Sequence, residues 1–74
     1  MKEYDIVEVI VEKEKYAKEG VHKGMQGVIL DPRKIDGCWL VFFTDPETGM
    51  DNDGTVIKEE DLKLIYESKY VPNN

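Results

Sequence analysis

The run CWLVFFT at residues 38–44 constrains the fold of this chain more than any other segment. Apolar side chains fill both of its alternating positions, with Cys38, Leu40 and Phe42 in one set and Trp39, Val41 and Phe43 in the other. A strand that is apolar on both faces is typical of the interior of a sheet. We therefore predict that this run forms the central strand of a β-sheet.

Four other segments have the features of short strands. Residues 4–13 alternate along two faces and are rich in β-branched side chains, and residues 25–31 alternate in the same way before ending at Pro32. Both patterns are typical of strands. The segments TVIK at 55–58 and LKLIYE at 62–67 are shorter runs of the same kind. Five short strands in 74 residues predict a small all-β domain.

The first connection, residues 14–24, mixes five charges with two glycines and lacks an apolar helical stripe. We predict a long exposed loop in which Tyr16 and Val21 fold inward. A short helical turn at 14–18 is the alternative.

The later connections carry turn residues. Asp36-Gly37 is a hairpin signal, and residues 45–54 are rich in Asp, Asn, Glu and Gly, which predicts a loop. The three acids at 59–61 precede a leucine and predict a single 3₁₀ turn before the last strand. Residues 68–74 predict a flexible C-terminal tail.

The segment KGMQGVIL at 23–30 places glycines at Gly24 and Gly27 and an aliphatic residue at Ile29. Together with the strand layout, it resembles SH3-like barrels of the KOW-related kind. The chain is also similar to short bacterial single-barrel proteins of unknown function, some of which lie in phage or toxin-defence neighbourhoods. The resemblance implies a five-stranded SH3-like barrel over residues 1–67, with a long first loop and a 3₁₀ turn before the last strand.

Two binding modes of better-known relatives fit this sequence poorly. The stretch VIKEEDL at 56–62 has charges where peptide-binding SH3 domains carry Pro and Tyr, so we do not expect their peptide groove. KOW domains contact RNA or partner proteins from their loops, and the corresponding cations here are Lys23, Arg33 and Lys34. The resemblance therefore favours contact with a protein.

The charge distribution supports the same reading. The net charge is −6, and residues 44–62 alone hold seven acids and one base. Such a balance repels phosphate backbones, so nucleic-acid binding is not expected. No apolar run approaches the length of a membrane span, and the charged N-terminus has no signal-peptide pattern. Cys38 is the one cysteine, so no internal disulfide can form, and within its apolar run we expect it to be a buried core thiol. We therefore expect a cytoplasmic protein.

Candidate chemistry is sparse. His22 is the one histidine and lies in the first loop with no nucleophile assigned to it, so we expect no enzyme activity. Residues 49–60 match a calcium-loop pattern except that Gly49 replaces its first Asp. Strands instead of helices flank this loop, so we expect a solvated acidic loop, with weak calcium binding as the alternative. No cofactor or metal is predicted.

We predict a small non-catalytic protein-interaction module, either monomeric or a weak homodimer. Its acidic loop would bind a basic partner surface, as an immunity or inhibitor-type protein does. The partner-binding residues that we predict are Trp39, Phe43, Asp51, Asp53, Glu59, Glu60 and Tyr66.

Two alternatives stay open at this point. The aromatic face of Trp39 and Phe43 could be covered by tyrosines, for which the candidates are Tyr4, Tyr16, Tyr66 and Tyr70. The chain could instead be a KOW-like accessory module of the ribosome or transcription machinery. That function predicts a basic surface cluster formed by Lys15, Lys18, Lys23, Arg33 and Lys34.

Overall fold

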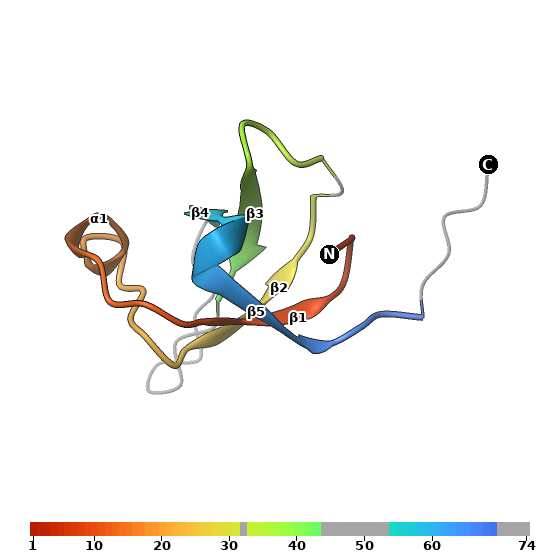
Figure 1. Cartoon of the computed structure of the whole chain (residues 1–74), viewed down its shortest axis with the longest axis horizontal. Coiled ribbons are helices and arrows are strands. Elements are labelled where there is room, and N and C mark those ends of the chain that lie inside the picture. Colours follow the sequence, from red (N-terminus) through yellow and green to blue (C-terminus); the bar gives the residue numbers. More distant parts are fainter. Residues whose placement is uncertain (32, 44–53, 70–74) are drawn as a thin grey trace.

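The computed structural model describes residues 1–31, 33–43 and 54–69, and it is an all-β structure as predicted (Figure 1). Its elements in chain order are β1 (Ile6–Val9), α1 (Glu14–Ala17), β2 (Gln26–Ile29), β3 (Cys38–Phe42), β4 (Thr55–Lys58), η1 (Glu59–Asp61) and β5 (Leu62–Tyr66). Each of the five predicted strands is present, and η1 is the predicted 3₁₀ turn.

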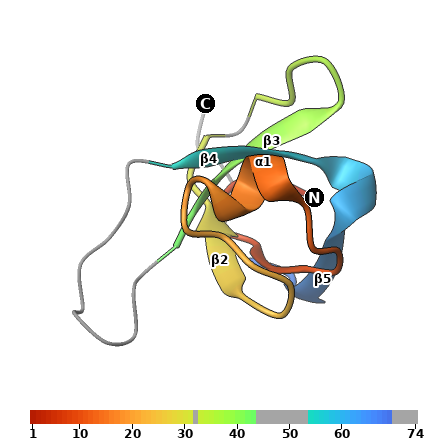
Figure 2. The same cartoon turned by 90° about the vertical axis from the view of Figure 1, so that its left-hand side faces the viewer.

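All five strands belong to one antiparallel sheet in the order β4-β3-β2-β1-β5. As predicted, β3 is paired on both sides, with β2 and β4, although β2 holds the middle position. The edge strands β4 and β5 follow each other in the chain and are joined by η1. The sheet is curved. In the view of Figure 2, its edge strands β4 and β5 lie on opposite sides of α1.

The core forms on the inner face of this curved sheet. Every strand contributes at least one residue to it, and the loop that contains α1 adds two more. Its members are Val7, Val9, Tyr16, Val21, Ile29, Trp39, Val41, Phe43, Ile57 and Leu62. Burying one such aliphatic or aromatic side chain stabilises a fold by about 1.5–3 kcal/mol.

The alternation of β3 decides which of its two apolar sets is inside. Trp39 and Val41 are buried, whereas Cys38, Leu40 and Phe42 are half-buried on the outer face. The expectation that Cys38 is a buried core thiol is therefore wrong. The reason is the period of two: once Trp39 points inward, its neighbour Cys38 must point outward.

The first connection contains the short helix that the sequence offered as an alternative. Helix α1 spans four residues, and both Tyr16 and Val21 are buried as predicted. None of the helices in the described part of the chain is long and apolar enough to cross a membrane.

The hairpin between β2 and β3 follows its sequence signal. Asp36 and Gly37 both have positive φ, 53° and 75°, as a two-residue hairpin turn with right-handed twist requires. Ile35 and Cys38 flank the turn as a bridge pair and exchange backbone hydrogen bonds of 3.1 and 2.9 Å.

Asp5 ties the N-terminus to the segment after β5. Its carboxylate is 1% exposed and accepts hydrogen bonds from the backbone amides of Lys2 at 2.8 Å and Ser68 at 2.7 Å. Burial alone would raise the pKa of Asp5, but these bonds and the Lys2 ammonium outweigh it, and the pKa is lowered. The first residue of the predicted tail is thus hydrogen-bonded, while residues 70–74 lie outside the described residues.

This lowered pKa predicts a pH dependence. A carboxyl group whose pKa falls on folding stabilises the protein above its unfolded pKa, near 4, and loses that contribution as the pH drops through its folded pKa. We expect Asp5→Asn to cost about 1–2 kcal/mol at neutral pH and to approach the wild type in strong acid. Urea unfolding between neutral and acidic pH measures this. Glu19→Gln, at an exposed site, is the control, and a constant Asp5→Asn deficit at every pH would contradict the assignment.

Candidate functional site

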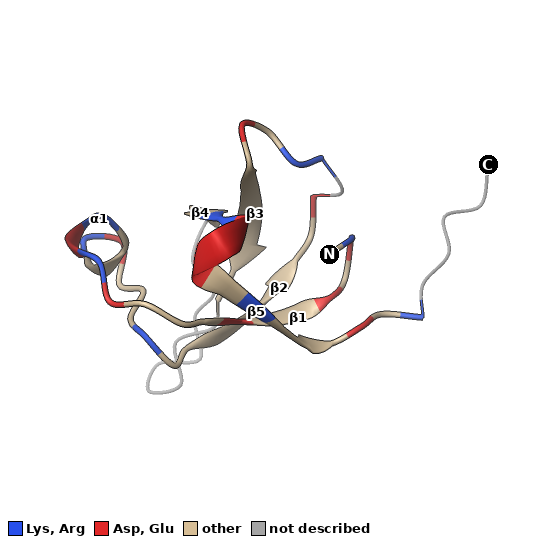
Figure 3. Cartoon of the chain, in the orientation of Figure 1, with Lys and Arg blue, Asp and Glu red and all other residues tan. Residues whose placement is uncertain are grey.

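The predicted acidic site centres on η1, which is red in Figure 3 because all three of its residues are acidic. The turn is fixed by its connection to the β2–β3 hairpin, since the amide of Glu59 donates a 2.9 Å hydrogen bond to the carbonyl of Gly37. The three carboxylates of η1 have different environments, and this difference decides which of them a partner can reach.

Glu59 is engaged within the fold. Its Oε1 accepts a 3.0 Å hydrogen bond from the indole Nε1 of Trp39, and its Oε2 lies 3.3 Å from the ammonium of Lys34. The bond from Trp39, and then that from Lys34, lowers the pKa of Glu59. This carboxylate therefore stays charged, but its charge is largely compensated by its neighbours.

Asp61 is buried, with 4% of its surface exposed, and links η1 to α1. Its Oδ2 accepts hydrogen bonds from the Tyr16 hydroxyl at 2.6 Å and the Lys13 ammonium at 2.9 Å. Burial alone would raise the pKa of Asp61, but the bonds from Lys13 and Tyr16 outweigh it, so that the pKa is lowered. The Asp61 carboxylate is therefore engaged by Lys13 and Tyr16 within the fold, and it is not available to a partner.

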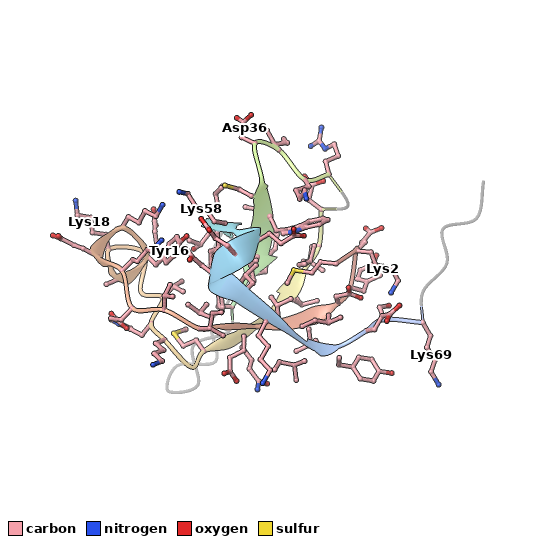
Figure 4. The ribbon with its side chains drawn as sticks, viewed as in Figure 1. Lys2, Tyr16, Lys18, Asp36, Lys58 and Lys69 are labelled. Atoms are coloured by element: carbon pink, nitrogen blue, oxygen red, sulfur yellow. The ribbon has the colours of Figure 1, made fainter. Side chains whose placement is uncertain are left out.

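Tyr16 completes this network at the edge of the sheet. Its hydroxyl oxygen accepts a 3.2 Å hydrogen bond from the backbone amide of Lys58, and Figure 4 shows Tyr16 and Lys58 next to each other between α1 and β4. Burial and the bond to Asp61 raise the pKa of the Tyr16 hydroxyl. The Lys58 amide, which points away from β3, is thereby satisfied by a side chain, and this end of the β4 edge is closed.

Glu60 is the one η1 carboxylate that faces solvent. Its side chain is 73% exposed, and its nearest cation is Lys58 at 3.9 Å. An exposed pair at this distance contributes little to stability. Of the two predicted η1 contacts, Glu59 and Glu60, Glu60 is the more accessible to a partner.

The predicted aromatic contacts, Trp39, Phe43 and Tyr66, form what we call the aromatic rim, and two of the three do not lie on the surface. Trp39 and Phe43 are 5% and 3% exposed and belong to the core, which Tyr16 also joins. The expectation of an exposed aromatic face is therefore wrong for these two residues, which lie on the inner face of the sheet. Phe43 finds its space at Gly27, where an added Cβ would lie 2.8 Å from the ring. Tyr66 alone of the rim is exposed, at 56%, on β5.

The other predicted residues are distributed as follows. Asp51 and Asp53 lie outside the described residues, as does Tyr70, and Tyr4 is 42% exposed. Glu60, the last position of the calcium-loop pattern at 49–60, lies within the described residues. Across residues 1–31, 33–43 and 54–69, no group of three or more His, Cys, Asp or Glu side chains is placed to hold a metal ion. The calcium alternative therefore rests on sequence alone.

The cations proposed for a KOW-like surface are partly engaged. Asp31 binds Arg33 through two side-chain contacts of 3.2 and 3.1 Å, and Lys34 pairs with Glu59. Lys15 lies 5.2 Å from the centre of the Tyr16 ring. In Figure 3, α1 and the β2–β3 hairpin lie at different corners of the molecule. These contacts do not favour a single basic face.

His22 is exposed, and its Nδ1 lies 2.9 Å from the carboxylate of Glu12, which also accepts a bond from the amide of Lys23. Cys38 lies on the outer face of β3, where its thiol donates to the Asp36 carbonyl at 3.7 Å. The structure thus gives each of these two reactive side chains a local partner.

Sequence reasoning missed a cavity of about 300 Å³ beside the β2–β3 hairpin. Its apolar lining comes from Ile35 and from the outer faces of β3 and β4. The signal for it is Ile35, an isolated aliphatic residue within a polar turn sequence, RKIDG. The chain matches no protein-family model, no curated protein and no solved structure.

Proposed function

We propose that this chain is a small SH3-like barrel that serves as a non-catalytic protein-interaction module in the cytoplasm. Support for the barrel comes from the strand order, with β1 between β2 and β5, and from η1, which joins the two edge strands. Support for a non-catalytic role comes from His22 and Cys38, whose hydrogen-bond partners are Glu12 and Asp36 and not each other.

One observation carries the proposed function, and it is the uneven charge. Residues 44–53 hold four acids and no base, whereas the rest of the chain holds twelve acids and ten bases. Several of those other acids, including Asp31, Glu59 and Asp61, are already paired with cations. Most of the net negative charge of the chain therefore lies in the sequence between β3 and β4.

The partner that suits this charge is a protein with a basic surface. Complementary charge speeds association and selects among partners more than it raises affinity. An enzyme that binds nucleic acid presents such a basic surface, and a small acidic protein that covers it would act as an immunity or inhibitor-type protein. Asp51, Asp53 and Glu60 are the residues that we assign to this contact.

The test compares two variants of equal charge. We expect Asp51→Asn, Asp53→Asn and Glu60→Gln together to slow association about tenfold or more at low salt, because they weaken electrostatic steering. The matched control neutralises three acids elsewhere, Glu3, Glu14 and Glu19. The partner is first captured from host lysate and identified by mass spectrometry, and association rates are then measured at low and high salt. Equal rates for wild type and variant, or equal slowing in the control, would rule out this acidic contact.

A further inference from the structure

The two most exposed large hydrophobic side chains of the described residues line the same cavity. Val56 on β4 is 62% exposed and Ile35 in the hairpin is 60% exposed. Single exposed aliphatic residues are common on protein surfaces, but two that flank one apolar cavity mark a contact site.

Strand pairing explains why these side chains meet. Val56 lies opposite Leu40 in the β3–β4 ladder, and Ile35 forms a bridge pair with Cys38 at the start of β3. Leu40 and Cys38 are half-buried and form the floor, with Trp39 also in the lining. We call this cavity the hairpin groove. Its volume, about 300 Å³, is at the small end of the range for binding pockets, and it suits a side chain better than a large ligand.

Among the described residues that line the hairpin groove, three are charged: Asp31, Arg33 and Asp36. Asp31 and Arg33 neutralise each other through their side-chain contacts. Asp36, at the tip of the hairpin in Figure 4, is exposed, and its carboxylate has no ion-pair partner within the described ranges. Within the described part of the chain, the groove is therefore an apolar site beside one exposed carboxylate, that of Asp36, which forms no ion pair there.

We propose that the hairpin groove docks a segment of a partner protein that inserts an aliphatic side chain between Ile35 and Val56 and presents a lysine or arginine to Asp36. This rests on the proposed function in taking the occupant to be a protein, and it adds the place and the chemistry of the contact. A second copy of this chain is a poorer occupant, because each copy carries a net charge of −6 and like charges oppose association.

The geometry of β4 indicates how the segment binds. Addition of a strand to the β4 edge would need its outward amides, but the amide of Lys58 is taken by the Tyr16 hydroxyl. The partner segment is therefore held mainly by its inserted side chain and its cation, and not by an extended ladder of backbone hydrogen bonds.

The test uses a random peptide display library selected against the full chain. We expect enriched peptides to carry an aliphatic residue next to a lysine or arginine. Their binding is followed by the fluorescence of Trp39, which is the one tryptophan of the chain and lines the groove. Ile35→Asp or Val56→Asp should raise the Kd about tenfold or more, the loss expected for a central apolar anchor. Asp36→Asn should weaken binding and reduce its salt dependence.

The control variant is Ile65→Asp, at an exposed apolar position on β5 that does not line the groove, and its affinity should equal that of the wild type. If Ile35→Asp alters the circular dichroism spectrum, Ile35→Ser replaces it. Three outcomes would overturn the proposal: no enrichment, enrichment of acidic peptides, or a Kd that is the same for both groove variants as for the wild type. A wild-type dimer that Val56→Asp dissociates would assign the groove to a second copy instead. Failure here leaves the acidic contact untouched, because that contact is measured with different variants.

Discussion

Gly27→Val should destabilise the fold by about 3 kcal/mol or more, at the upper end of what overpacking a core costs. An added Cβ at Gly27 would lie 2.7 Å from the carbonyl oxygen of Phe42 and 2.8 Å from the ring of Phe43. Neither neighbour can move freely, because Phe42 is paired with Val28 across the sheet and Phe43 is buried in the core. A domain of this length holds only about 4–11 kcal/mol of stability, so much of it would be lost.

Urea unfolding followed by Trp39 fluorescence measures this loss. Gly27→Ala should fall between the wild type and Gly27→Val, because it adds the clashing Cβ without the two methyl groups. Gln26→Val is the matched control, since it introduces the same side chain at an exposed position of the same strand. A Gly27→Val midpoint equal to that of the wild type would mean that Phe43 does not pack over Gly27.

The strands were predictable because their signal is local. A period of two and β-branched content are visible in the few residues that form each strand, and the positive φ values of Asp36 and Gly37 follow from a two-residue turn signal. The run at 38–44 identified an interior strand for the same reason.

The inner face of that strand was not predictable from the run itself. Both alternating sets of side chains in the run are apolar. Which set points into the core therefore depends on the space that the neighbouring strand leaves for it. The space that accepts Phe43 exists because Gly27, on β2, has no side chain. A residue on another strand thus decides that Phe43 is core, and the predicted aromatic rim failed at this point.

The carboxylates of η1 show the same limit. Three adjacent acids predicted a 3₁₀ turn correctly, but they gave no sign that one of them is buried. The partners of Asp61 are Tyr16 and Lys13, which lie 45 and 48 positions away in the chain. Contacts of that range leave no trace in a local pattern, and they convert a residue counted as surface charge into a structural one.

Removing the Asp61 carboxylate is the second change with a large expected effect. We expect Asp61→Ala to cost about 2–3 kcal/mol, because the buried Tyr16 hydroxyl then loses its acceptor. Asp61→Asn should cost less, since an amide oxygen still accepts the bond from Tyr16, while Lys13 turns to solvent. As the pKa of Asp61 is lowered in the fold, its contribution disappears as the pH falls below about 4, and wild type and Asp61→Asn should converge there.

A double-mutant cycle with Tyr16→Phe separates this network from general damage. If the Tyr16 hydroxyl and the Asp61 carboxylate stabilise the fold through their mutual hydrogen bond, the double variant should lose less stability than the sum of the two single-variant losses. We expect the difference to be about 1 kcal/mol. Hydrogen exchange gives an independent reading, because the amide of Lys58 is bound to the Tyr16 hydroxyl and should lose protection in both variants. Additive losses with a protected Lys58 amide would show that α1 is held to β4 and η1 by apolar burial of the Tyr16 ring, and not by its hydroxyl.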